Sequence, residues 1–203
     1  MIHRVARMSR GQTALVTAAA SGVGLALIDL LRDLGVRVLA AAAARHHALL
    51  REAGAEPIEG RSAPVDAGAL ALLPDGVDAA FDGVGGAQLR QCIRATRKGG
   101  IAVWYGFMGL DGSFAGVLRN ALDLYVGARL RGRRGAFYGI TALYRKDPRP
   151  FHEDLPKLFA LLGERRIRPR IAARLPLLDA REANERLERG GVAGKLVLVD
   201  DAR

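Results

Sequence analysis

A strand, a turn of small residues and a helix follow one another near the start of the chain, and this succession narrows the possible folds most. An apolar run at 13–17 ends in small residues at 18–21, and a helical apolar pattern extends over 23–34. Gly35 ends that pattern, and a second apolar run follows at 36–40. A β-α-β unit of about 30 residues has the size of a right-handed parallel crossover. The sequence therefore predicts a parallel sheet.

The same alternation continues along the chain. Further strands are expected at 57–58, 77–81, 101–105 and 136–140, and helices at 45–53, 67–73, 87–96 and 117–125. Strands that alternate with helices predict an α/β fold, a Rossmann-type doubly wound parallel sheet covered on both faces. Beyond the Pro-rich stretch 147–150, the pattern predicts helix 151–164, strand 171–175, helix 178–189 and strand 195–199. We expect a Rossmann domain over 1–150 and a C-terminal α/β extension over 151–203.

The composition excludes several classes of protein. No stretch approaches the roughly 20 apolar residues that cross a bilayer, and the first residues lack the apolar region of a signal peptide. The single Cys92 excludes an internal disulfide and a cysteine-rich zinc site. We therefore expect a cytoplasmic protein with no metal site and no membrane contact.

The net charge of +10 raises the question of nucleic-acid binding. Two arginine clusters contribute to it: Arg129, Arg131, Arg133 and Arg134, and Arg165, Arg166, Arg168 and Arg170. Arginine greatly outnumbers lysine, neither cluster is interleaved with stacking aromatics, and no nucleic-acid motif is present. We expect no nucleic-acid partner, although a basic face also attracts the phosphates of a dinucleotide.

The turn after the first strand has the small residues that a dinucleotide fold needs. Small side chains let the backbone approach a pyrophosphate and let the next helix direct its N-terminus at the phosphates. Against the pattern G-x-G-x-x-G, Ala19 and Ser21 replace the first two glycines and Gly24 retains the third. A plain connector remains an alternative, but the position between a strand and a helix favours the nucleotide turn.

The end of the second strand indicates which cofactor is preferred. An NAD-binding fold places a carboxylate there, whereas residues 40–44 are all alanine and are followed by Arg45 and His46. Cationic groups suit a 2′-phosphate, so NADP is favoured over NAD. The alternative is that these residues only begin a solvated helix. The segments 82–86 and 105–107 end the fourth and fifth strands, where the ribose and nicotinamide of a dinucleotide would lie.

Four segments together resemble a known family. They are GQTALVTAAASGVG, AGAEPIEGR, GVDAAFDGVGGAQLRQCIRATRKGGIAVWYGF and GGVAGKLVLV. Their order is similar to that in the zinc-independent, quinone-oxidoreductase-like members of the medium-chain dehydrogenase/reductase superfamily. The resemblance implies an NADPH-dependent reductase of quinones, enones or related carbonyls that is commonly dimeric. It implies cofactor-binding roles for Ser21, Gly22, Val23, Gly24, Arg45, His46, Arg61, Val84, Tyr105, Gly106, Phe107, Phe137, Tyr138 and Lys195.

The chain departs from the family pattern at three positions. Ser21 replaces a glycine at the phosphate turn, His46 stands where a lysine is common, and Gly60 stands where many members have a tyrosine near the adenosine. Arg61 is what remains of that last pair. Each change weakens the expected cofactor affinity.

Family members begin with a β-rich catalytic domain that forms the other wall of the cleft. The resemblance implies that residues 2–7 are the end of the helix that links the two domains, so we expect a truncated form. Strands 171–175 and 195–199 would then have open edges. A second copy, a partner chain or repacking on the Rossmann core could cover them. The candidates for a proton donor to a small-molecule substrate are Tyr105 and Tyr138.

Three interpretations follow. The chain binds NADP(H) and reduces a quinone, enone or related carbonyl; or it is an inactive nucleotide-binding remnant; or the fold has been reused for a non-redox reaction on a small molecule, such as a cyclisation in a biosynthetic pathway.

Overall fold

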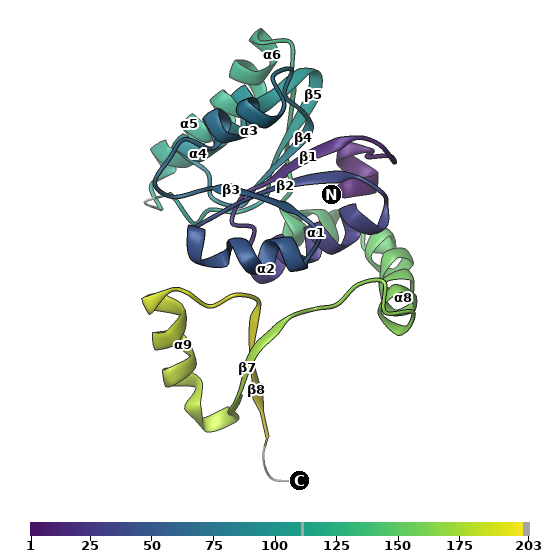
Figure 1. The fold of residues 1–203 in the computed structure, drawn as a ribbon, viewed down its shortest axis with the longest axis vertical. Helices are drawn as coiled ribbons and strands as arrows, with labels where there is room; N and C mark the ends of the chain where they lie inside the picture. Colours follow the sequence, from purple (N-terminus) through teal and green to yellow (C-terminus); the bar gives the residue numbers. More distant parts are fainter. Residues whose placement is uncertain (111, 201–203) are drawn as a thin grey trace.

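A computed structural model describes residues 1–110 and 112–200, and it contains the predicted parallel sheet (Figure 1). Six strands lie in the order β3-β2-β1-β4-β5-β6, and every pair of neighbours is parallel. Their bounds are β1 Thr13–Val16, β2 Arg37–Ala42, β3 Glu56–Glu59, β4 Val77–Asp82, β5 Thr96–Trp104 and β6 Arg134–Phe137. The order reverses between β1 and β4, which is where open α/β sheets bind ligands.

Helices cover both faces of the sheet (Figure 1). One face packs on the π-helical turn η1 (Ile2–Ala6), on α1 (Gly22–Asp33) and on the η2–α2 segment (Ala44–His46 and His47–Glu52). The other face packs on α3 (Val65–Leu72) and α4 (Ala87–Ala95), and on the continuous helical stretch α5–η3–α6 (Phe114–Leu122, Asp123–Gly127 and Ala128–Leu130). The strands are apolar on both faces because both faces are covered, as the sequence predicts.

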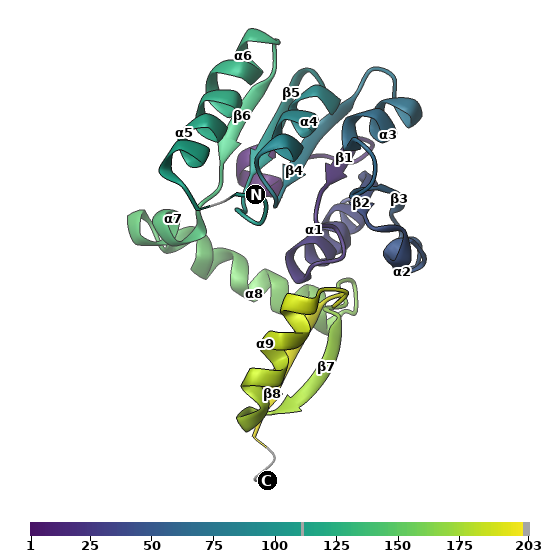
Figure 2. The same ribbon diagram turned by 90° about the vertical axis from the view of Figure 1, so that its left-hand side faces the viewer.

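The part of the C-terminal extension that follows α8 (Arg149–Gly163) forms a lobe below the sheet (Figure 2). The lobe is reached through α7 (Ile140–Lys146) and α8, and it contains β7 (Ile171–Pro176), η4 (Leu177–Asp179), α9 (Ala180–Arg189) and β8 (Lys195–Val199). Strands β7 and β8 pair in parallel as a two-stranded sheet, so each has only one strand neighbour in the described part of the chain. The expected boundary between residues 150 and 151 falls inside α8, and the division into two domains stays a prediction.

Ion pairs and hydrogen bonds hold this lobe against α1. Arg166 forms an ion pair with Asp33 at 2.7 Å, and the amide nitrogen of Arg168 donates to a carboxylate oxygen of Asp29 at 2.8 Å. Arg4 of η1 also forms an ion pair with Asp154 of α8. These links hold the lobe against the Rossmann domain, and its glycine-rich segment 190–194 reaches the turn between β1 and α1.

Several expected elements have wrong bounds, and two strands show the reason. Strand β6 ends at Phe137 rather than continuing to residue 140, because Gly139 precedes α7 and the chain turns away from the sheet. Strand β5 begins at Thr96 rather than at residue 101, since Thr96 already pairs with Val77 before an irregular step in the ladder. In the described part of the chain, no helix has both the length and the apolar character needed to span a membrane.

Candidate nucleotide-binding site

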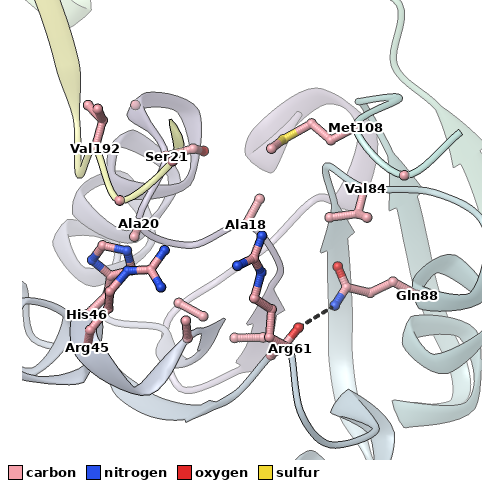
Figure 3. A pocket seen from close by; sticks show the side chains of 18 of the residues that line it. Ala18, Ala20, Ser21, Arg45, His46, Arg61, Val84, Gln88, Met108 and Val192 are labelled. Carbon is pink, nitrogen blue, oxygen red and sulfur yellow. Dashed lines mark hydrogen bonds between the residues drawn. The ribbon is translucent and has the colours of Figure 1, made fainter. Parts of the chain in front are cut away.

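A cleft of about 910 Å³ lies at the carboxyl ends of β1, β2, β3 and β4 (Figure 3). The segment between α9 and β8 forms its other wall. Seven of the predicted cofactor residues line it: Ser21, Gly22, Arg45, His46, Arg61, Val84 and Lys195. The volume lies within the usual range for small-molecule and cofactor sites.

The turn between β1 and α1 presents a helix N-terminus to the cleft. Ser21 caps α1, and its hydroxyl oxygen accepts a hydrogen bond from the amide nitrogen of Gly24 at 3.1 Å. A Cβ atom on Gly24 would lie 2.5 Å from the carbonyl oxygen of Ala18, so the turn has no room for a side chain there. Ser21 therefore takes over one amide of a helix N-terminus that otherwise attracts a phosphate.

Cationic groups surround the ends of β2 and β3. Arg45 and His46 lie on one side of the cleft, and Arg61 projects into it from the other (Figure 3). Burial and then the neighbouring Arg45 lower the pKa of His46, so this imidazole is mostly neutral at pH 7. The described lining residues include Lys195 as a third full cation and no carboxylate. The cleft is therefore electropositive.

A buried carboxylate organises the loop after β4. The Thr17 hydroxyl donates to Asp82 at 2.7 Å, and the amide nitrogen of Gly85 donates to the other carboxylate oxygen at 2.7 Å. The amide nitrogen of Gly83 in turn donates to the Thr17 hydroxyl oxygen at 3.1 Å. Burial raises the pKa of Asp82 despite these hydrogen bonds. Asp82 therefore shapes the wall of the cleft from beneath and does not line it.

The aromatic residues expected near the nicotinamide lie outside the cleft lining. The Tyr105 hydroxyl donates to the carbonyl oxygen of Thr17 at 3.3 Å, and burial raises its pKa. Phe107 and Phe137 pack with Trp104 in a cluster of rings, with the Phe107 and Phe137 centroids 5.6 Å apart. Tyr138 packs against the core. Phe107 and Phe137 therefore lie together, and none of the four expected aromatic residues lines the cleft.

The three other predicted residues, Val23, Gly24 and Gly106, do not line the cleft. Gly24 lies behind the phosphate turn, Val23 is exposed at the first turn of α1, and Gly106 is packed against the backbone of Gly83. The cofactor-binding roles of all these residues stay predictions.

Nineteen further lining residues are not predicted individually as cofactor contacts, although Ala18, Ala20 and Gly85 lie in the predicted segments 18–21 and 82–86. They are Ala18, Ala20, Ala41, Ala42, Ala43, Gly60, Ala63, Gly85, Ala87, Gln88, Gln91, Met108, Gly109, Leu187, Gly190, Gly191, Val192, Gly194 and Leu196. Pairing of β2 and β3 accounts for Ala41, Ala42 and Gly60, because Gly60 follows β3 and its amide nitrogen donates to the carbonyl oxygen of Ala42. The segment 190–194 carries a sequence signal, three glycines in five residues, but only the tertiary structure brings it to the phosphate turn.

The arrangement suits the binding of phosphate groups more than acid–base or metal chemistry. A helix N-terminus, three full cations and a wide opening at the strand ends are present. Within residues 1–110 and 112–200, no three histidine, cysteine, aspartate or glutamate side chains come together to hold a metal ion. Zinc chemistry therefore has no ligand set in the described part of the chain.

An open parallel sheet with such a cleft at its switch point defines a dinucleotide-binding α/β domain of the Rossmann type. Residues 54–198 match the family described as zinc-binding dehydrogenase. The chain belongs to this family, and it corresponds to the dinucleotide-binding half of the medium-chain dehydrogenase/reductase superfamily.

Known relatives include reductases and parts of larger synthases. The chain is 30% identical over 203 residues to a probable quinone oxidoreductase of Schizosaccharomyces pombe, with 98% of this chain and 58% of the relative covered. It is 31% identical over 140 residues to prostaglandin reductase-3 of Mus musculus, covering 64% of this chain and 37% of that protein. A highly reducing polyketide synthase of Didymella fabae is 27% identical over 203 residues, covering 97% of this chain and 10% of the synthase. The chain thus spans only part of each relative.

Solved structures agree with this placement. The quinone oxidoreductase from Coxiella burnetii superposes with a TM-score of 0.72 at 28% identity, over 96% of this chain and 54% of that one. The CurK enoyl reductase gives a TM-score of 0.83 at 16% identity, over 98% and 57%, and this likeness concerns the fold alone.

Proposed function

We propose that this chain binds NADP(H) in the cleft and serves as the nucleotide-binding half of a reductase that acts on a quinone, an enone or a related carbonyl. The observation that carries the proposal is the set of cations at the ends of β2 and β3, Arg45 and Arg61, in a lining without a carboxylate among the described residues. A 2′-phosphate would form charge-assisted hydrogen bonds there, whereas a ribose 2′-hydroxyl would lack an acceptor.

The small residues of the phosphate turn fit the pyrophosphate of such a cofactor. Gly22 and Ser21 would hold it at the N-terminus of α1, with the Lys195 ammonium beside them. Bound NADPH supplies the hydride of the reaction. The role of this chain is then to orient the cofactor and to exclude water from one side of it.

The proposal also extends to the proton donor and to the surface that covers the substrate. Tyr105 keeps its hydroxyl on the Thr17 carbonyl, and its raised pKa makes it a reluctant donor of a proton. The open edges of β7 and β8, with Ile171 and Leu178 exposed, favour coverage by a second copy or by another chain. A cytoplasmic location is part of the proposal, in keeping with a single, buried Cys92.

Titration with NADPH and NADH, followed by fluorescence or calorimetry, tests this function. We expect NADPH to bind more tightly than NADH. Arg45→Ala should lower the affinity for NADPH on the order of tenfold and leave the affinity for NADH unchanged. Arg129→Ala is the matched control, because it removes an arginine that does not line the cleft.

The outcomes separate the interpretations. No binding of either cofactor at millimolar concentration would reject the proposal in favour of a non-redox enzyme. NADPH binding without turnover of a panel of quinones and enones would favour a nucleotide-binding remnant.

A further inference from the structure

A carboxylate holds the loop that follows β3. One oxygen of Glu59 accepts three backbone hydrogen bonds, from the amide nitrogens of Gly60 at 3.1 Å, Arg61 at 2.8 Å and Ser62 at 3.1 Å. Three convergent N–H groups form an anion-binding concavity, and in this chain the concavity is filled by the chain's own side chain. The hydrogen bond from Arg61 and then that from Ser62 lower the pKa of Glu59, so the carboxylate is ionised at neutral pH.

Two further contacts fix the same loop from its other sides. The amide nitrogen of Gly60 also donates to the carbonyl oxygen of Ala42 at 3.0 Å. The Gln88 side-chain nitrogen donates to the carbonyl oxygen of Gly60 at 3.2 Å (Figure 3). A Cβ atom on Gly60 would lie 2.7 Å from the amide nitrogen of Ala42, so the loop packs directly on the end of β2. The loop is therefore held to β2, to α4 and to Glu59.

The braced loop presents Arg61 to the cleft. Its side chain rises from the loop into the opening between Ala18 and Val84 (Figure 3). The ion pairs between described residues do not include Arg61, so its charge is not neutralised by a carboxylate of the described chain. A guanidinium offers several hydrogen-bond donors in a fixed plane. The position of the loop backbone therefore decides whether the donors of Arg61 reach a bound phosphate.

We infer that Glu59 is a positioning residue for cofactor specificity: its carboxylate fixes loop 60–62 so that Arg61 reaches the 2′-phosphate of NADP(H). The inference rests on the proposed function, because it assigns Arg61 to a phosphate subsite of the same cleft. The expected effect of the Glu59 carboxylate on NADPH affinity is the opposite of its direct electrostatic effect. A carboxylate close to a bound phosphate would weaken binding if only its charge mattered, whereas a carboxylate that positions Arg61 strengthens it.

Affinities of four variants for NADPH and NADH test the inference. We expect Glu59→Ala and Arg61→Ala each to lower the affinity for NADPH by about tenfold, which is the effect of losing one charge-assisted hydrogen bond. The affinity for NADH should not change. The double variant should bind NADPH no more weakly than Arg61→Ala alone, since both changes remove one interaction. Glu59→Gln keeps an oxygen acceptor and should restore part of the NADPH affinity. Glu56→Ala is the control, because Glu56 lies on the same strand, pairs with Arg37 and does not line the cleft.

Each other result overturns the inference. Tighter NADPH binding by Glu59→Ala would show that the Glu59 carboxylate acts only by repelling the bound phosphate. Equal losses for NADPH and NADH, or additive losses in the double variant, would assign it a general structural role. Thermal melting of every variant checks that the fold is intact. Failure of the unchanged protein to bind either cofactor would reject the proposed function instead. A comparison of 2′,5′-ADP with 5′-AMP as competitors isolates the contribution of the 2′-phosphate.

Discussion

The amide nitrogen of Gly194 donates a hydrogen bond to the carbonyl oxygen of Ala20 at 3.0 Å. The start of β8 is therefore bonded to the turn between β1 and α1, residues 17–21. Ser21 and Gly194 form a parallel β-bridge at the same place. The side chain of Lys195 lies over Gly22, where an added Cβ atom would come within 2.5 Å of it. Two segments about 170 residues apart in the chain are thus joined where they line the cleft. Anything that loosens the C-terminal lobe should loosen the nucleotide site.

The first prediction concerns Gly194. This residue has φ +101°, and a Cβ atom would lie 2.5 Å from the carbonyl oxygen of Arg170. We expect Gly194→Ala to lower the free energy of unfolding by about 2–3 kcal/mol, from strain and overpacking together, and to weaken NADPH binding. Gly11→Ala is the control, because Gly11 has φ +84° and open space around it. It should cost about 1 kcal/mol and leave NADPH affinity unchanged. Equal NADPH affinity in both variants would show that the lobe does not support the site.

The second prediction compares two helical glycines by urea unfolding. A Cβ atom on Gly24 would collide with the carbonyl oxygens of Ala18 and Ala19, whereas on Gly68 the nearest atom lies 3.5 Å away on Ile58. Gly24→Ala should therefore destabilise the fold by about 3 kcal/mol or more. Gly68→Ala should stabilise it by about 0.5–1 kcal/mol, because alanine is the better helix former. A neutral Gly24→Ala would mean that the turn relaxes easily.

The third prediction concerns the pH dependence of stability. Burial raises the pKa of Asp82, so the folded protein holds this proton more tightly than the unfolded chain does. The contribution of Asp82 is then complete below its unfolded pKa of about 4 and declines as pH rises through the folded pKa. We expect the free energy of unfolding, measured relative to Asp82→Asn, to fall between pH 4 and neutral pH. Parallel pH profiles for the two proteins would contradict the raised pKa.

The fourth prediction concerns His46 and the cofactor. Because burial and Arg45 lower the pKa of His46, the imidazole becomes a cation only in mildly acidic solution. We expect the ratio of NADPH affinities between the unchanged protein and His46→Gln to grow as pH falls below about 6.5. The ratio removes the titration of the 2′-phosphate itself, which is common to both proteins. NADH serves as the control and should give a ratio that does not change with pH. A constant NADPH ratio would place His46 outside the phosphate subsite.

Much of the fold could be predicted because each local pattern agrees with the sheet. The run 13–17, the small turn and the helical pattern after it correspond to β1, the turn and α1, and every further predicted strand has a counterpart. The errors lie at the ends of elements. Thr96 joins β5 because Val77 pairs with it, and residues 138–140 leave the sheet because α7 begins at Ile140. Pairing with a distant strand decides such ends, and no local pattern contains it.

The sequence by itself determined the class of site. Small residues after the first strand and arginine in place of a carboxylate after the second are local features with direct chemical meaning. Only the tertiary structure decided which groups share the cleft. It placed Lys195 beside Gly22, held Arg61 on a loop braced by Glu59 and Gln88, and kept Tyr105 on the Thr17 carbonyl. Apart from the local hydrogen bonds of Glu59, these relations depend on contacts between segments far apart in the chain, and such contacts follow from packing rather than from any local pattern.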